Sequence, residues 1–145
     1  MDIDTIKSAL EGYQPSNSRS QLLEKGTNTI ILDAYNANPS SMKLALENMA
    51  TLHTEKSKWL LLGAMKEMGD SCYEEHKSLV DLANQLNFEQ VLLVGEEFES
   101  VKAQYQWFAT SAEAYDWISR NPIVNSVILV KGSRGSKMEV VLEAL

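Results

Sequence analysis

Two short polar segments hold most of the residues in this sequence that could do chemistry. In residues 33–38, a carboxylate, a phenol and two amides follow the apolar run 29–32. In residues 131–137, three cations, two glycines and two serines follow the apolar run 126–130. Short apolar, β-branched runs are typical of strands buried on both faces. Each polar segment therefore stands at the carboxyl end of a predicted strand, where open α/β sheets bind ligands.

Each segment also has a plainer explanation. Asn38 and Pro39 fit the N-cap and first position of a helix, so residues 33–38 could be a simple connection with Asx capping. Residues 131–137 could be a solvated basic loop, or could hold an anion through backbone N–H groups. They are not a P-loop, because the GxxxxGK[ST] spacing is absent, and they are not a dinucleotide fingerprint. The residue types alone leave these alternatives open.

Apolar periodicity predicts the elements that must position these segments. A strand at 20–24 and the strand at 29–32 are joined by a tight turn, which predicts a hairpin. Further strands are predicted at 59–62, 90–94, 106–109 and 126–130. Helical patterns begin at Pro39, after a cap at Asp70 or Ser71, at Glu96, after a cap at Thr110 (in a capping box with Glu113) and at Met138, the last running to Leu145.

The alternation of strand and helix predicts an α/β fold. We expect a three-layer, mostly parallel, Rossmann-like sheet with helices on both faces and the hairpin at one edge. Strands ending at Asp33, Gly63, Gly95 and Gly132 would finish on one rim. The two polar segments would then share an edge of the sheet, one offering a carboxylate and amides and the other offering cations.

Composition narrows the class of protein. The sequence has 145 residues, 44% of them hydrophobic, which suits one soluble domain with a sizeable core. A formal net charge of −7 argues against nucleic acid or an anionic membrane as a partner. The single cysteine, Cys72, cannot form an internal disulfide, and no apolar run is long enough for a membrane span. We expect a cytoplasmic monomer without membrane insertion.

Three motifs carry a family resemblance. Residues 33–42 resemble the DxYNANPxSM signature of the Mur ligases, in the branch that adds D-Ala-D-Ala to UDP-N-acetylmuramoyl-tripeptide. Residues 62–69 are similar to the LGxMxELG segment of the family, although Ala64 replaces the usual acid and Met68 the usual leucine. Residues 129–139 match LVKGSRxxxME almost residue for residue. Together these motifs span most of the sequence in family order.

The resemblance implies a nucleotide site on the first polar segment. Asp33 would contact the ribose hydroxyls, and Tyr35, Asn36 and Asn38 would surround the nucleotide or shape the turn. Arg19 would approach the phosphates, for which a planar guanidinium is well suited. Taken alone, without the resemblance, Arg19 is better explained as a solvated loop arginine.

The resemblance also implies an acceptor site on the second polar segment, where residues of the Lys-Gly-Ser-Arg stretch would line the pocket for D-Ala-D-Ala. Its carboxylate is a sensible ligand for cations and hydroxyls. Glu67 would stand near the incoming amine or a domain interface, with an exposed loop acid as the alternative. His76 is a second candidate, with a satisfied packing residue as the alternative. The substrate-binding set is Lys131, Gly132, Ser133, Arg134, Glu67 and His76. No His or Cys spacing indicates a zinc site.

The implied reaction needs more than these residues. In the family, ATP phosphorylates the tripeptide carboxylate, and the amine of D-Ala-D-Ala attacks the acyl phosphate. Residues 1–25 would be the end of a preceding domain plus the first strand, and 26–145 the C-terminal ligase domain. We expect ATP and Mg²⁺ to act in the full-length enzyme, with no cofactor held by this domain alone. UDP-N-acetylmuramoyl-tripeptide would bind through the missing domains, so the isolated chain should be inactive.

Two other classes of protein remain as alternatives. A free-standing nucleotide-binding α/β regulatory module would bind ATP tightly without any ligase activity. A protein-interaction domain would need Trp107 and Trp117 to be exposed. Neither alternative explains why all three motifs occur in family order.

Overall fold

The computed structural model describes residues 21–33, 38–65, 69–132 and 137–145. The described strands are β1 (Gln21–Lys25), β2 (Asn28–Asp33), β3 (Ser57–Gly63), β4 (Gln90–Val94), β5 (Gln106–Phe108) and β6 (Ser126–Lys131). The described α-helices are α2 (Pro39–Thr51), α3 (Cys72–Gln85), α4 (Ser111–Arg120) and α5 (Glu139–Leu142). Two 3₁₀ turns among these residues are η1 (Gly69–Ser71) and η2 (Glu96–Val101).

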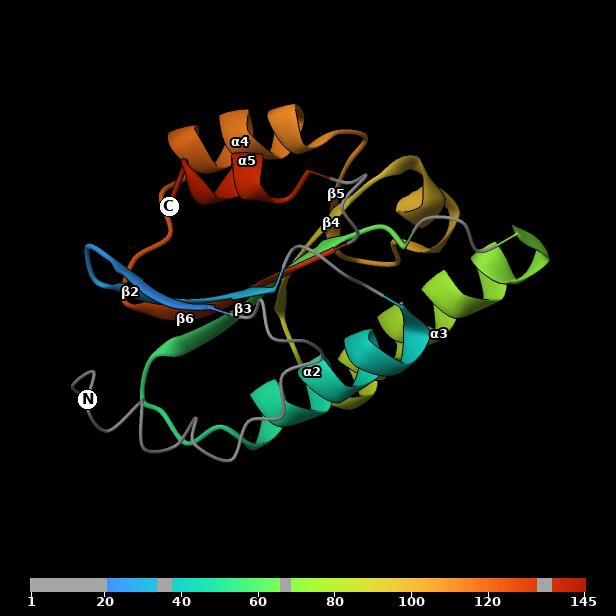
Figure 1. Cartoon of the computed structure of the whole chain (residues 1–145), viewed down its shortest axis with the longest axis horizontal. Helices are drawn as coiled ribbons and strands as arrows, with labels where there is room; N and C mark the ends of the chain where they lie inside the picture. Colours follow the sequence, from blue (N-terminus) through green and yellow to red (C-terminus); the bar gives the residue numbers. More distant parts are fainter. Residues whose placement is uncertain (1–20, 34–37, 66–68, 133–136) are drawn as a thin grey trace.

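Within the described ranges, six strands form one sheet in the order β1-β2-β6-β3-β4-β5. The β1–β2 pair is antiparallel, and every other neighbouring pair is parallel. Helices α2 and α3 cover one face of the sheet, whereas α4 and α5 cover the other (Figure 1). The predicted fold, including the N-terminal hairpin at the edge, is confirmed.

The last strand, β6, occupies the centre of the sheet, and all of its residues are buried. Its side chains alternate between the two faces, as the twofold period of a strand requires. Val127 and Leu129 join the cluster under α2 and α3, and Ile128 and Val130 join the cluster under α4 and α5. Apolar side chains on both sides explain why this strand reads as a continuous hydrophobic run.

Three predicted elements differ from the observed ones in detail. The last helix, expected from Met138 to Leu145, covers only Glu139–Leu142. The long helix has its N-cap at Ser71, one of the two predicted positions, and starts at Cys72, but the 3₁₀ turn η1 that precedes it was not predicted. Thr110 caps α4 by accepting from the Glu113 N–H, but the Glu113 carboxylate accepts from the Ala109 N–H instead of the N-cap N–H. Each difference concerns a helix end, where few intrahelical bonds fix the backbone.

The carboxyl ends of β3, β4 and β5 are tied together by backbone contacts around Gly95. The Ala64 N–H donates to the Val94 carbonyl at 2.9 Å, and the Gly95 N–H donates to the Phe108 carbonyl at 2.8 Å. Gly95 has a φ of 122°, and a Cβ on it would lie 2.7 Å from the Ala64 Cβ. Glycine is therefore required here both for its backbone conformation and for the close approach of Ala64.

We predict that Gly95→Ala lowers the free energy of unfolding by about 2–4 kcal/mol, since it adds backbone strain to a steric clash. Gly26→Ala is the matched control, because Gly26 also has a positive φ (60°) but has no atom within 4 Å of the added Cβ. Gly26→Ala should lower the free energy of unfolding by only about 1 kcal/mol. Urea unfolding of both variants tests this. Equal losses would show that the Ala64 contact is unimportant.

A second prediction concerns alkaline pH. Tyr105 is buried, and its hydroxyl donates to the Phe88 carbonyl at 2.8 Å. Burial raises the pKa of Tyr105 above its ordinary value of 10.0. A raised pKa means that the folded state favours the neutral phenol, so its contribution to stability is present below about pH 10 and lost as the pH rises through the folded-state pKa.

The stability difference between the wild type and Tyr105→Phe should therefore shrink when urea unfolding is repeated from about pH 8 to about pH 11. Below pH 10, the variant should be less stable by about 1 kcal/mol or more, because the Phe88 carbonyl loses its donor. Parallel stability profiles for the two proteins over this range would contradict the prediction.

Candidate functional site

The topology marks the carboxyl edge around β6 as the place for a ligand. The chain leaves β2 and β3 toward α2 and α3 on one face of the sheet, and leaves β6, which lies between them, toward α5 on the other face (Figure 1). Connections that diverge in this way leave a crevice at the strand ends, and open α/β sheets bind ligands in such crevices.

The structure brings the starts of the two polar segments together at this edge. Asp33 is the register partner of Lys131 across the β2–β6 pair, and Leu62 of β3 is the partner of Lys131 on the other side. Lys131 is fully buried, and Gly132, which follows it, is buried as well. Buried lysines are rare unless they are paired. The end of β6 is therefore a polar position inside an otherwise apolar sheet centre.

Asn38 forms the N-cap of α2. Its Oδ1 accepts from the Ser41 N–H at 2.9 Å, and its own N–H donates to the Ser41 Oγ at 3.1 Å. Pro39 occupies the first turn of the helix, as predicted. The capping explanation for this residue is thus confirmed, and a contact of Asn38 with a nucleotide stays a prediction.

His76 lies on the buried side of α3 and is completely inaccessible. Its Nε2 accepts from the Met65 N–H at 3.0 Å, and its Nδ1 lies 2.7 Å from the Cys72 carbonyl oxygen. Its ring stands edge-on to Phe98, with 4.8 Å between ring centroids. In this arrangement both ring nitrogens are engaged with the backbone. Nothing in the residue pattern indicated Met65 as the partner of His76.

Six of the predicted site residues lie outside the described residues. They are Arg19, Tyr35, Asn36, Glu67, Ser133 and Arg134. Their roles stay predictions. Among the described residues that flank them, Asp33 ends β2, Met65 and Gly132 come just after β3 and β6, and Asn38 and Gly69 stand at the starts of α2 and η1.

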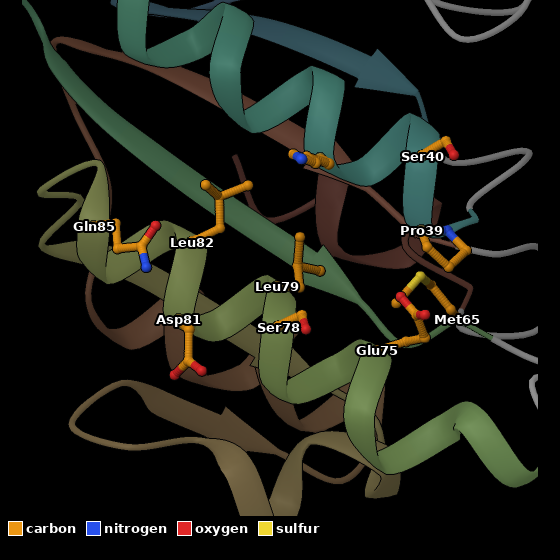
Figure 2. Close-up of a pocket in the computed structure, with 10 residues that line it drawn as sticks. Pro39, Ser40, Met65, Glu75, Ser78, Leu79, Asp81, Leu82 and Gln85 are labelled. Atoms are coloured by element: carbon orange, nitrogen blue, oxygen red, sulfur yellow. The ribbon is translucent and has the colours of Figure 1, made fainter.

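A groove between α2 and α3 adjoins this edge and was not predicted from the sequence (Figure 2). It has a volume of about 490 Å³ and is lined by Pro39, Ser40, Lys43, Met65, Glu75, Ser78, Leu79, Asp81, Leu82 and Gln85. Met65 lies at the end where α2 begins (Figure 2). The exposed polar residues of two separate helices form most of its rim, and only the packing of those helices makes them neighbours.

The charged side chains around the groove come from both of its walls. Asp81 pairs with Lys77 one helical turn earlier at 2.9 Å, and this hydrogen bond raises the pKa of Lys77. Both side chains are about half exposed, so the pair contributes little to stability. Lys43 lines the opposite wall of the groove. The groove therefore offers both signs of charge around an apolar base.

The tryptophans do not form an exposed patch. Trp107 and Trp117 are both half-buried and packed against the two core clusters. The Trp107 Nε1–H donates to the Gly95 carbonyl at 2.7 Å, and the Trp117 ring lies 6.0 Å from the Phe108 ring. Both tryptophans therefore pack against the core. The alternative of a protein-interaction domain required them to be exposed, and this requirement is not met.

Two features are absent from the described part of the chain. Within residues 21–33, 38–65, 69–132 and 137–145, no group of three or more His, Cys, Asp or Glu side chains could hold a metal ion. No helix in the same ranges is long and apolar enough to cross a membrane.

A doubly wound, mostly parallel sheet defines an α/β domain of the class that commonly binds ligands at the carboxyl edge. Residues 18–134 match the family described as "Mur ligase, glutamate ligase domain". The chain belongs to this Mur ligase family, and the resemblance carried by the three motifs is confirmed.

Individual relatives agree with this assignment. The chain is 31% identical to the UDP-N-acetylmuramoyl-tripeptide–D-alanyl-D-alanine ligase of Borreliella burgdorferi, over 94% of this chain and 31% of that protein. The MurF ligase of Thermotoga maritima, solved in complex with ADP, is 26% identical with a TM-score of 0.74, over 92% of this chain and 31% of that one. A MurF structure from Acinetobacter baumannii is 30% identical with a TM-score of 0.74, over 99% and 33%. The chain thus spans about a third of the length of these relatives.

We predict that Asn38→Ala destabilises the chain by about 1 kcal/mol, because the Ser41 N–H loses its capping acceptor. Asn38→Asp should keep most of the stability, since a carboxylate accepts the same hydrogen bond and favours the helix N-terminus. Urea unfolding of both variants is the measurement. An alanine variant as stable as the wild type would show that the cap contributes nothing.

Proposed function

We propose that this chain is the C-terminal domain of an ATP-dependent ligase that adds D-Ala-D-Ala to UDP-N-acetylmuramoyl-tripeptide in peptidoglycan synthesis. Support comes from the family match and from relatives of that name, which align with nearly all of this chain. Residues 26–145 would form the domain, and residues 1–25 the connection from a preceding domain plus the first strand. We propose that this domain acts in the cytoplasm, where ATP is available.

The observation that carries this proposal is the register of β2 against β6. It sets Asp33 beside Lys131, so a nucleotide bound by the first polar segment would be next to an acceptor bound by the second. An amide-forming ligase needs this proximity, because the activated carboxyl and the attacking amine must meet while water is kept away.

The nucleotide side of the edge would use Asp33, Tyr35, Asn36 and Asn38. A carboxylate at a strand end can accept hydrogen bonds from the two ribose hydroxyls. Arg19 would approach the phosphates, where its guanidinium can stabilise charge that grows during transfer. The Thermotoga maritima relative, whose structure contains ADP, supports a nucleotide in this family.

The acceptor side would use Lys131, Gly132, Ser133 and Arg134. Cations and a hydroxyl suit the carboxylate of D-Ala-D-Ala, and a glycine allows close approach of the backbone. Glu67 would stand near the incoming amine. These groups would position the nucleophile and exclude water, and the phosphate-transfer machinery would lie in other domains.

The proposed reaction has two steps. A carboxylate oxygen of the tripeptide attacks the γ-phosphorus of ATP, which forms an acyl phosphate and releases ADP. The amine nitrogen of D-Ala-D-Ala then attacks the acyl carbon, and the tetrahedral intermediate expels phosphate while the nitrogen loses a proton. Mg²⁺ would accompany the nucleotide, and we assign it no ligand among the described residues, which hold no suitable cluster.

A domain exchange tests the proposal. We would replace the corresponding third of the Borreliella burgdorferi ligase with this chain and measure ADP release. We expect release that requires both UDP-N-acetylmuramoyl-tripeptide and D-Ala-D-Ala, whereas the isolated chain should give none. In the same protein, Arg134→Ala should raise the KM for D-Ala-D-Ala by about 10- to 100-fold, the cost of losing a charge-assisted hydrogen bond.

The control is Lys102→Ala. Lys102 is the C-cap of η2, and its ammonium is 5.2 Å from the centroid of the Trp107 ring on β5, a strand that β3 and β4 separate from β6. Its KM values should match those of the unsubstituted hybrid. A folded hybrid that releases no ADP, combined with tight ATP binding by the isolated chain, would instead identify a nucleotide-binding module.

A further inference from the structure

His76 shares features with both a core residue and a functional residue. It is fully buried, yet both of its ring nitrogens contact backbone atoms. A backbone amide can only donate, so the bond from Met65 makes Nε2 the acceptor. A neutral imidazole has one donor and one acceptor nitrogen, which places the proton on Nδ1, pointing to the Cys72 carbonyl. The surrounding backbone thus selects one tautomer of a neutral ring.

The residue that His76 holds lies just beyond the end of β3. Met65 comes two residues after Gly63, and its own side chain is buried at the end of the groove near Pro39 and Glu75 (Figure 2). The preceding residue, Ala64, donates to the Val94 carbonyl and faces Gly95. The Met65 bond to His76 therefore continues the series of contacts that fixes this end of β3.

This end of β3 adjoins the proposed acceptor side. Leu62 is the register partner of Lys131, so Gly63 stands next to Gly132, and the chain reaches Met65 two residues later. A displacement of the backbone at Met65 would thus occur beside the Lys131–Gly132 end of β6. The nucleotide side lies on the opposite flank of β6, at the end of β2.

His76 cannot contact a ligand directly in this arrangement, because its ring is covered and its nitrogens are used. We infer that His76 is a positioning residue, whose neutral, Nδ1-protonated ring holds the Met65 backbone and thereby sets the affinity of the acceptor side. The effect on affinity rests on the proposed function, whereas the effect on Met65 does not.

The first test needs only the wild-type chain. The ¹⁵N shifts of the His76 ring should show a protonated Nδ1 and an unprotonated Nε2 at neutral pH. A ring protonated on Nε2, or on both nitrogens, would overturn the inference, because neither form can accept from Met65.

The second test compares two substitutions in the chain and in the domain-exchanged ligase. His76→Phe keeps an aromatic ring against Phe98 but has no acceptor, whereas His76→Gln is long enough to place an acceptor oxygen near Met65. His76→Phe should speed hydrogen exchange at the Met65 amide by about tenfold beyond any change in global unfolding. It should raise the KM for D-Ala-D-Ala by about tenfold. His76→Gln should restore both values.

Phe98→Leu is the matched control, since it removes the ring contact and keeps the acceptor. It should lower stability without changing the KM for D-Ala-D-Ala. Equal KM values for D-Ala-D-Ala in the wild type, His76→Phe and His76→Gln would contradict the inference and show that His76 serves only in packing. If the domain-exchanged ligase has no activity at all, the proposed function fails, and the ring shifts and Met65 exchange still decide whether His76 holds the backbone.

Discussion

The site depends on the insertion of β6 between β2 and β3. This strand is the last one among the described residues, and it pairs on both sides, with β2 and with β3. Its apolar side chains bury themselves in both core clusters, each contributing roughly 1.5–3 kcal/mol. Burial on both faces fixes the register, because a shift by one residue would exchange the two sets of side chains. The same register sets Asp33 beside Lys131, so core packing determines the geometry of the polar edge.

Apolar packing fixes where the strands lie, and polar contacts then fix how their ends leave the sheet. Hydrogen bonds from Ala64, Gly95 and Trp107 join the exits of three strands, and His76 adds a contact from α3. Each such bond contributes about 1 kcal/mol, less than the burial of one large apolar side chain. These hydrogen bonds matter because they fix the direction in which the chain leaves each strand. An edge that positions two substrates needs its backbone held in one place.

Local signals in the sequence predicted local structure well. Asn38 and Pro39 gave the start of α2 because a cap involves only neighbouring residues. The apolar run of β6 gave a strand buried on both faces because its pattern directly reflects its surroundings. Helix ends were less predictable, as Glu113 and the short α5 show. At those positions several backbone arrangements cost nearly the same, and contacts from elsewhere decide between them.

The sequence by itself determined the family, the alternation of strand and helix, and the placement of polar segments at strand ends. These depend on residue types and short-range periodicity, which a linear pattern records. Only the tertiary structure decided that Asp33 is the register partner of Lys131, that α2 and α3 form a groove, and that His76 accepts from Met65. Each of these joins residues from different elements, and their proximity follows from the burial of two apolar faces around one sheet, which no local pattern specifies.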